Sequence, residues 1–426
     1  MRTGGKKHVR AYGGVNRRQF LYRTGLGVLG AGLLPGIAGA STSEAPENVF
    51  SVRGKELIGP DGNPIKLRGW RLSEPYPLRY EETVTADIVA RYAEQGLLGN
   101  VQAMEIWWTA GDIRQPSEPR AQEPGVYAEE YLPRILDAMR VFVRAGSWIV
   151  PSIRVSFDAD RALEYTAAGS NWWEGWAHHK KVIWNEPVVV ESGPDAGTYG
   201  NHGDRFFDWL DWIISSILED EEIASRIAYW QIWHFFGHRH LNHLTDEDYD
   251  RYFNVFVPQL IEKFREHDPH RLLGISARAF HVMGPLIERV KDGRWQPWDD
   301  HNWVLNCGGY GHHDTLIDEP SYPTQWPESS YAPRWDGEAE EFDFQKYVRE
   351  TGLAVHSQEA PGLNEIYRRV PIPEPQRSFL VGLLNLYNEH ANGFTFHAWP
   401  PSHEDAPDES ELFDILRKAF AGERVE

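Results

Sequence analysis

Strand-like and helix-like segments alternate along the chain from residue 65 onward, and this alternation constrains the fold more than any other feature. The segments with strand character are short and apolar, and they span residues 65–70, 100–108, 148–155, 227–235, 272–277, 302–310, 353–359 and 393–399. A segment with helical character follows each strand, at residues 85–95, 127–145, 204–218, 246–267, 285–291, 342–351, 376–391 and 409–420. Eight β-then-α units predict a single α/β domain, a (β/α)8 TIM barrel, with long insertions after strands three and six.

Segment 204–218 illustrates the helical pattern, because its large apolar residues recur every three or four positions. Phe206, Leu210, Ile213 and Ile217 share one face at this spacing, as in a helix that packs against a sheet. An open, doubly wound sheet is the alternative arrangement of such units. Neither G-x-G-x-x-G nor G-x-x-x-x-G-K occurs in the alternating part of the chain, so no phosphate-binding fingerprint supports that alternative.

In a (β/α)8 barrel the reacting residues lie where strands end and loops begin. This rule selects the following candidates: Arg68, Trp70, Glu105, Trp107, Arg154, Trp233, His234, Tyr310, His356, Glu359, His397 and Trp399. Met104 and Ile106 face the opposite way from Glu105 in a strand, so we expect Glu105 to point into the barrel. The residue is either a proton donor or a buried salt-bridge partner of Arg68 or Arg154.

The charge balance is acidic, with 43 Lys and Arg against 63 Asp and Glu and a formal net charge of −20. Residues 1–40 contain seven basic and no acidic residues, so the rest of the chain carries a charge near −27. This field repels phosphate backbones and argues against nucleic acid as a partner. An acidic surface suits either solubility or adaptation to high salt, and both interpretations stay open. Cys307 is the single cysteine, which excludes a disulfide framework and a Cys-rich zinc site.

Residues 1–40 have the organisation of a twin-arginine-type signal peptide. An Arg-Arg pair at residues 17–18 precedes an apolar, Gly-rich run at 25–38, and Ala-Gly-Ala at 38–40 forms a cleavage pattern. The run has about 14 residues, short of the ~20 needed to span a bilayer. We therefore expect the twin-arginine export machinery as a partner, no stable membrane anchor after cleavage, an extracellular location, and one catalytic domain over residues 41–426.

Several phrases along the chain match those of one enzyme family. They are Val-Arg-Gly at 52–54, Asp-Gly-Asn-Pro at 61–64, Leu-Arg-Gly at 67–69, His-Asp-Pro-His-Arg at 267–271 and Gly-Phe-Thr-Phe-His-Ala-Trp at 393–399. In element order they resemble glycoside hydrolase family 5, the cellulase and mannanase group of retaining barrel enzymes. The resemblance implies a β-linked poly- or oligosaccharide as substrate and a carboxylate-based, retaining mechanism, with no cofactor.

The resemblance implies that the nucleophile ends strand seven, a position that Glu359 occupies. The acid/base should end strand four in an Asn-Glu-Pro phrase, where this chain has Trp233 and His234. The Arg expected on strand two is replaced by Ala103, and the His expected on strand three by Arg154. The departures fall in the catalytic centre, so the resemblance is stronger for the fold than for the reaction.

Asn185-Glu186-Pro187 spells the missing phrase, but in the insertion after strand three. Glu186 reaches the site in two arrangements: residues 181–184 are strand four, or the insertion folds back over the barrel. Because a retaining enzyme needs a second carboxyl group about 5–5.5 Å from the nucleophile, Glu186 is the first candidate for the acid/base. His234 is the second candidate and Glu105 is the third.

Side chains that bind substrate are expected around these groups. By resemblance, Tyr310 hydrogen-bonds near the nucleophile and Trp399 stacks on a sugar ring. The predicted substrate-binding set is completed by residues that end other strands, namely Trp107, Arg154, Trp233 and His397.

The first functional prediction is an exported glycoside hydrolase. The missing acid, Arg and His favour an alternative, a non-catalytic carbohydrate-binding protein on the same barrel. A second alternative is a metal-dependent hydrolase that uses the histidine-rich segments at 178–179, 238–243 and 312–313. No H-E-x-x-H phrase occurs, so we expect no metal site.

Overall fold

The computed structural model describes most of the barrel-forming part of the chain. The described residues are 49–72, 83–109, 132–156, 180–190, 197–234, 245–278, 289, 292–308, 352–360, 371–372, 374, 376–397 and 411–426. The predicted signal peptide and its cleavage position lie outside these residues. None of the helices within the described ranges has the length and apolar character needed to cross a membrane.

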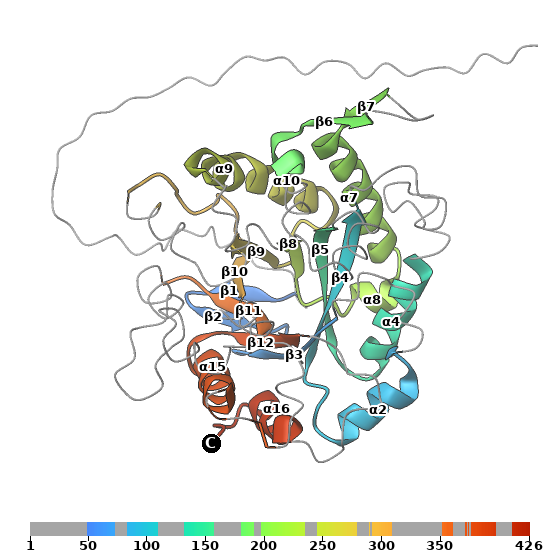
Figure 1. Cartoon of the computed structure of the whole chain (residues 1–426). Helices are drawn as coiled ribbons and strands as arrows, with labels where there is room; N and C mark the ends of the chain where they lie inside the picture. The colour runs from blue at the N-terminus through green and yellow to red at the C-terminus, as the bar shows by residue number, and fades with distance from the viewer. Residues whose placement is uncertain are drawn as a thin grey trace, which may run out of the picture. The chain divides into compact units, whose positions relative to one another are not determined.

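Eight parallel strands close into a barrel in the order β10-β11-β12-β3-β4-β5-β8-β9 (Figure 1). The strands are β3 Leu67–Leu72, β4 Val101–Thr109, β5 Trp148–Ser156, β8 Trp230–His234, β9 Leu273–Arg278, β10 Trp303–Gly308, β11 Val355–Ala360 and β12 Gly393–His397. Each of the eight predicted strands overlaps one barrel strand, and strands that follow one another along the chain are neighbours in the barrel. The predicted (β/α)8 barrel is therefore confirmed.

Helices connect the strands and surround them (Figure 1). They are α2 Ala86–Glu94, α4 Leu132–Arg144, α7 His202–Leu218, α8 Glu221–Ala224, α9 Asp246–Arg251, α10 Val257–His267, α15 Gln376–His390 and α16 Glu411–Ala421. The helices predicted at 285–291 and 342–351 lie outside the described residues, apart from Arg289. The same holds for most of the insertion predicted after strand six.

The helix predicted over residues 246–267 has a wider turn in its middle. A π-helical turn, Tyr252–Phe256, joins α9 to α10. Pro258 stands in the first turn of α10 and has no N–H to donate to the carbonyl four residues earlier. The turn widens just before this missing hydrogen bond, as is common for short π segments within α-helices.

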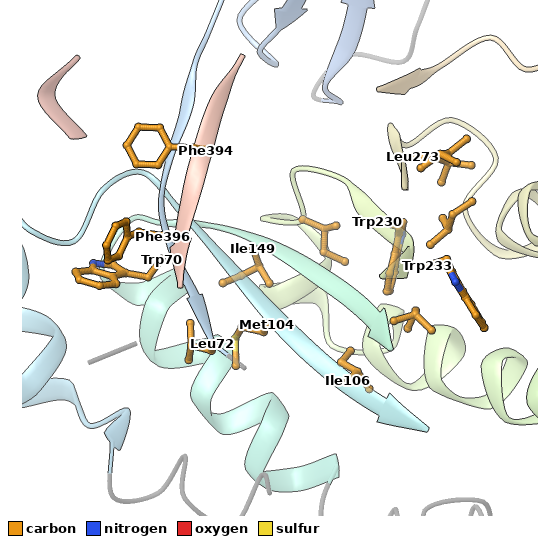
Figure 2. Packing of buried hydrophobic residues seen from close by; sticks show 14 of the residues in the cluster. Trp70, Leu72, Met104, Ile106, Ile149, Trp230, Trp233, Leu273, Phe394 and Phe396 are labelled. Carbon is orange, nitrogen blue, oxygen red and sulfur yellow. The ribbon is translucent and has the colours of Figure 1, made fainter. Parts of the chain in front are cut away.

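Apolar side chains form two layers on the two faces of the barrel strands. Trp70, Leu72, Met104, Ile106 and Phe396 belong to the outer layer, between strands and helices (Figure 2). Successive side chains of a strand point to opposite faces, so the residues between these positions face the barrel interior. The alternation along each strand thus places these apolar residues in the core between strands and helices, and the residues between them inside the barrel.

A smaller apolar cluster fills the amino-terminal end of the barrel interior. It contains Leu67, Val101, Ala103, Val150 and Tyr229 from neighbouring strands. An N-terminal hairpin that was not predicted from the sequence, β1 Ser51–Arg53 and β2 Glu56–Ile58, lies against this end. Leu57 of β2 and Phe50, which precedes β1, belong to the cluster. Polar interior residues are consequently found toward the carboxyl ends of the strands.

Candidate active site at the carboxyl end of the barrel

The carboxyl half of the barrel interior is polar, in contrast to its apolar floor. Its described side chains include Arg71, Glu105, Ser152, Arg154, Gln231, Thr395 and His397, and Asn306 and His356 lie below them, next to the floor. Most of them are fully buried, but the side chain of Arg154 is 13 % exposed and His397 is half-buried. Arg154 and His397 thus lie nearest to the solvent at the end where barrel enzymes bind substrate.

Arg71 of β3 lies at the centre of this polar layer, although the sequence rule did not select it. Its Nε donates to Glu105 Oε1 at 2.7 Å, and its two Nη groups donate to Gln231 Oε1 at 3.0 Å and to Ser152 Oγ at 2.8 Å. The Ser152 hydroxyl in turn donates to Gln231 Oε1 at 2.6 Å. These bonds link β3, β4, β5 and β8, and they satisfy donors of a guanidinium that is removed from water.

Glu105 lies between two guanidinium groups. Its Oε1 accepts from Arg71, and its Oε2 accepts from Arg154 Nη1 at 2.6 Å. Burial alone would raise the pKa of Glu105, but the charges of Arg154, Arg71 and His397 outweigh burial, and the pKa is lowered. The carboxylate is held ionised, which is the opposite of what a proton donor needs. Of the two roles that the sequence left open, the geometry favours the salt-bridge partner.

Two other strand-end candidates point away from the interior. Arg68, expected as a possible partner of Glu105, donates from Nε to Asn388 Oδ1 of α15 at 2.6 Å. Trp70 packs edge-on against Phe420 of α16, with ring centroids 5.6 Å apart. Both belong to the outward face of β3, so Arg71 takes the place expected for Arg68.

The pairing of β8 with β9 shifts register between Gln231 and Trp233, which changes the face of the sheet to which the last residues of β8 point. Trp233 is fully buried in the outer layer (Figure 2). Its ring centroid lies 5.3 Å from that of Phe206 and 4.9 Å from that of Phe256. The substrate contact expected for Trp233 is therefore replaced by core packing. After the shift, His234 pairs in register with Arg154 of β5.

Glu359 is the penultimate residue of β11, the seventh strand of the barrel, and pairs in register with Gly308 of β10. The pairing of β11 with β12 shifts register between Ser357 and Ala360, so Glu359 lies in an irregular strand end. The strand position matches the expectation for the nucleophile. The side chain of Glu359 lies outside the described part of the structure.

Several other expected site residues are only partly described. Trp107 of β4 pairs in register with Arg154, but the side chains of Trp107 and His234 lie outside the described part of the structure. The residues that lie wholly outside it are Tyr310 and Trp399, together with the histidine-rich segments 178–179, 238–243 and 312–313.

Glu186 lies in a connection that precedes a two-stranded hairpin, β6 Pro187–Val190 and β7 Gly197–Asn201. Residues 180–184 are helical, so the alternative in which 181–184 form strand four is wrong. Asn185 has φ = 53°, and its Oδ1 accepts the backbone N–H of Asp204 in the first turn of α7 at 3.0 Å. The Asn-Glu-Pro phrase is thus a turn that caps a neighbouring helix.

His356 of β11 is buried below the charged groups, where it contacts Tyr229 and the Leu67 carbonyl. The carbonyl oxygen, 3.1 Å from Nε2, can only accept, so Nε2 carries the proton. Nδ1 then accepts from the Tyr229 hydroxyl at 2.9 Å. Burial lowers the pKa of His356 to about 4, and the imidazole is neutral at pH 7. The sequence rule selected this residue as a strand end, but its surroundings make it a structural histidine.

Among the described residues, one group has the composition of a metal site, Asp211, Glu266 and His267 on α7 and α10. Lys263 already places its ammonium 3.0 Å from Asp211 and 2.8 Å from Glu266. A lysine therefore supplies the positive charge at this helix surface, away from the barrel strands. No step of a reaction is assigned to this group.

The described barrel has the same fold as solved structures of several endoglucanases and β-glucanases. The catalytic domain of the Thermobifida fusca endoglucanase Cel5A, in complex with cellotetraose, matches with a TM-score of 0.52 and 10 % identity over 88 % of this chain and 98 % of that chain. A β-glucanase from Saccharophagus degradans matches with a TM-score of 0.51 and 12 % identity over 88 % and 93 %. No protein-family model and no curated protein sequence matches the chain. The likeness confirms the fold expected from the sequence resemblance.

We expect Glu105→Gln to lower the free energy of unfolding by about 3–5 kcal/mol, because a neutral amide leaves the charges of Arg71 and Arg154 uncompensated inside the barrel. Glu222→Gln is the matched control, since it removes a pair in which both oxygens of Glu222 accept from Arg144 at 2.9 Å on the surface. Surface pairs contribute little, so the control should change stability far less. Urea unfolding measures both, and equal losses in the two variants would contradict the structural role of Glu105.

Protonation of His356 should destabilise the protein in mild acid. The pKa in the folded state, about 4, lies below the usual 6.5, so unfolding takes up a proton between these values. This contribution to stability is complete above about pH 6.5 and falls by about 3 kcal/mol as the pH drops to 4. Chemical unfolding of the wild type and His356→Gln across this range should show a shallower pH dependence in the variant. Parallel curves would show that His356 does not titrate in this way.

Proposed function

We propose that this chain is a glycoside hydrolase that cleaves β-linked poly- or oligosaccharides. The observation that carries the proposal is the place of Glu359, at the carboxyl end of the seventh strand of a family-5-type barrel. One structure with the same fold, the Thermobifida fusca endoglucanase, was solved with cellotetraose, which makes β-glucan the first substrate to test.

In the proposed mechanism Glu359 attacks the anomeric carbon and forms a glycosyl-enzyme intermediate. A second group protonates the leaving oxygen and later activates water. Glu105 is poorly suited to this role because two guanidinium groups hold it ionised. Glu186 leads into the hairpin β6–β7, whereas His234 ends the fourth barrel strand opposite Arg154. The place of His234 at the end of a barrel strand favours it over Glu186 as proton donor, and an imidazole is a common general acid and base in enzymes.

A non-catalytic carbohydrate-binding protein is the second candidate function. One observation favours it: among the described side chains of the barrel interior, Glu105 is the carboxylate, and both of its oxygens are bound by arginine. Such a protein would bind saccharides at the same end of the barrel and release no reducing sugar.

Export by the twin-arginine machinery is a further part of the proposal. It is supported by the Arg-Arg pair at 17–18, the apolar run at 25–38 and the Ala-Gly-Ala pattern at 38–40. An extracellular enzyme would meet polysaccharides that are too large to enter a cell intact. N-terminal sequencing of protein recovered from the culture medium should begin at Ser41, and recovery of the uncleaved chain from the cells alone would contradict export.

Glu359→Gln should abolish release of reducing sugar from β-glucans, mannans and xylans while saccharide affinity is retained, because the amide keeps the shape and loses the nucleophilic oxygen. Glu186→Gln is the matched control and should keep nearly full activity if the carboxylate before β6 takes no part. Activity that survives in Glu359→Gln would overturn the assignment of the nucleophile. Saccharide binding without any hydrolysis by the wild type would establish the second candidate function instead.

A further inference from the structure

We infer that Ser276 is a positioning residue for His234, the proton donor of the proposed reaction. The inference rests on the proposed function, because it concerns the same site and the same step. Its starting point is the irregular end of β8, where Trp233 and His234 occupy the last two positions of the strand. Ser276 lies on the neighbouring strand β9 and contacts this strand end directly.

The end of β8 carries one residue more than the strands beside it. On the β5 side, Gln231 pairs with Ser152. His234 pairs with Arg154, so three steps along β8 match two steps along β5. A β-bulge of this kind disrupts the hydrogen-bond ladder locally and bends the strand that carries it. The direction of the last residue of β8 therefore depends on contacts in addition to regular strand pairing.

Ser276 supplies such a contact. Its Oγ donates to the backbone carbonyl oxygen of Trp233 at 2.6 Å, and the hydrogen bond is buried. In the low dielectric of a protein interior a hydrogen bond is electrostatically stronger than in water. The carbonyl belongs to the planar peptide group between Trp233 and His234. The hydrogen bond thus fixes the orientation of the peptide group at which His234 begins.

Ser276 is itself held from the helix side of the barrel. The hydroxyl of Tyr252, in the π-helical turn between α9 and α10, donates to the carbonyl oxygen of Ser276 at 2.8 Å. Phe256 of the same turn packs edge-on against the ring of Trp233, with ring centroids 4.9 Å apart. The wider turn therefore places two side chains against the two strand ends that the hydrogen bond from Ser276 joins.

The orientation of this peptide group matters for the bond-cleaving step. As Glu359 bonds to the anomeric carbon, the bond to the leaving oxygen breaks and that oxygen takes the proton of the His234 imidazolium. The donor must lie within hydrogen-bond reach of the oxygen, and small displacements of a positioned group reduce the rate. Ser276 is fully buried, so it acts on this step through the backbone of β8 and does not contact the substrate.

The test uses two substrates whose leaving groups differ in their need for a proton. Cellotetraose releases a sugar, which needs a proton, whereas dinitrophenyl β-cellobioside releases a stable phenolate, which does not. Ser276→Ala should lower kcat/KM for cellotetraose about five- to tenfold, the effect of one lost hydrogen bond, and change that for the phenolate substrate less than about twofold. Ser276→Thr keeps the hydroxyl and should recover most of the rate. Equal losses on both substrates would overturn the proposal, since they would show a general structural role.

Ser216→Ala is the matched control for this comparison. The Ser216 hydroxyl also donates to a backbone carbonyl, that of Trp212 at 2.8 Å, but within the helix α7. The control should keep both rates, and a loss on cellotetraose as large as that of Ser276→Ala would overturn the proposal. If Ser276→Ala does not fold, Ser276→Cys replaces it, because a thiol is a weaker donor than a hydroxyl and should give a loss of the same kind.

A measurement on His234 itself separates this inference from the proposed function. Nitrogen-detected NMR identifies the His234 imidazole signals by their loss in His234→Gln. These signals should move in Ser276→Ala and stay in place in Ser216→Ala. Wild-type protein that releases no sugar contradicts the glycosidase, but moved signals still support the positioning of His234. Unmoved signals in Ser276→Ala overturn the inference, whether or not the wild type hydrolyses β-glucan.

Discussion

The described polar interior of this barrel is organised around the carboxylate of Glu105. Glu105 accepts from Arg71 through one oxygen and from Arg154 through the other, and the remaining donors of Arg71 reach β5 and β8. Removing three charges from water costs several kcal/mol for each ion, and only close, well-directed hydrogen bonds offset that cost. Four of the eight strands are therefore held in register by side chains as well as by their backbones. The apolar floor and the N-terminal hairpin close the other end, so the charged layer faces solvent from one side.

Periodicity carried most of the information about the fold, because the barrel consists of repeated units whose apolar faces must be buried. The predicted strands overlap the observed ones, and the alternation around Glu105 correctly turned it inward. Arg71 was missed for a simple reason: the first strand was expected to end at residue 70, and it extends to Leu72. Arg68 and Trp70 share the opposite parity and face the helices. Because the predicted strand ended two residues too early, the outward-facing Arg68 was selected instead of the inward-facing Arg71.

Three other parts of the site depend on features that no single sequence window contains. The shift in β8 inserts one residue relative to the neighbouring strands. A regular alternation of inward and outward side chains does not show where such an extra residue lies. The Asn-Glu-Pro phrase matched a catalytic pattern, but Asn185 is used to satisfy a backbone N–H of α7. His356 resembled an active-site residue by position, yet a backbone carbonyl and the Tyr229 hydroxyl determine its tautomer. In each case the chemistry is decided by a partner distant in sequence.

The register shift in β8 also restricts how this chain could change over time. At position 233 a carboxylate would enter the aromatic layer formed by Phe206 and Phe256, where a charge has no counterion among the described neighbours. Position 234 lies opposite Arg154, so a carboxylate that replaced the histidine would meet a cation across the strand pair. The extra residue thus makes position 234, and not position 233, the place at the end of the fourth strand where a carboxylate would have a counterion.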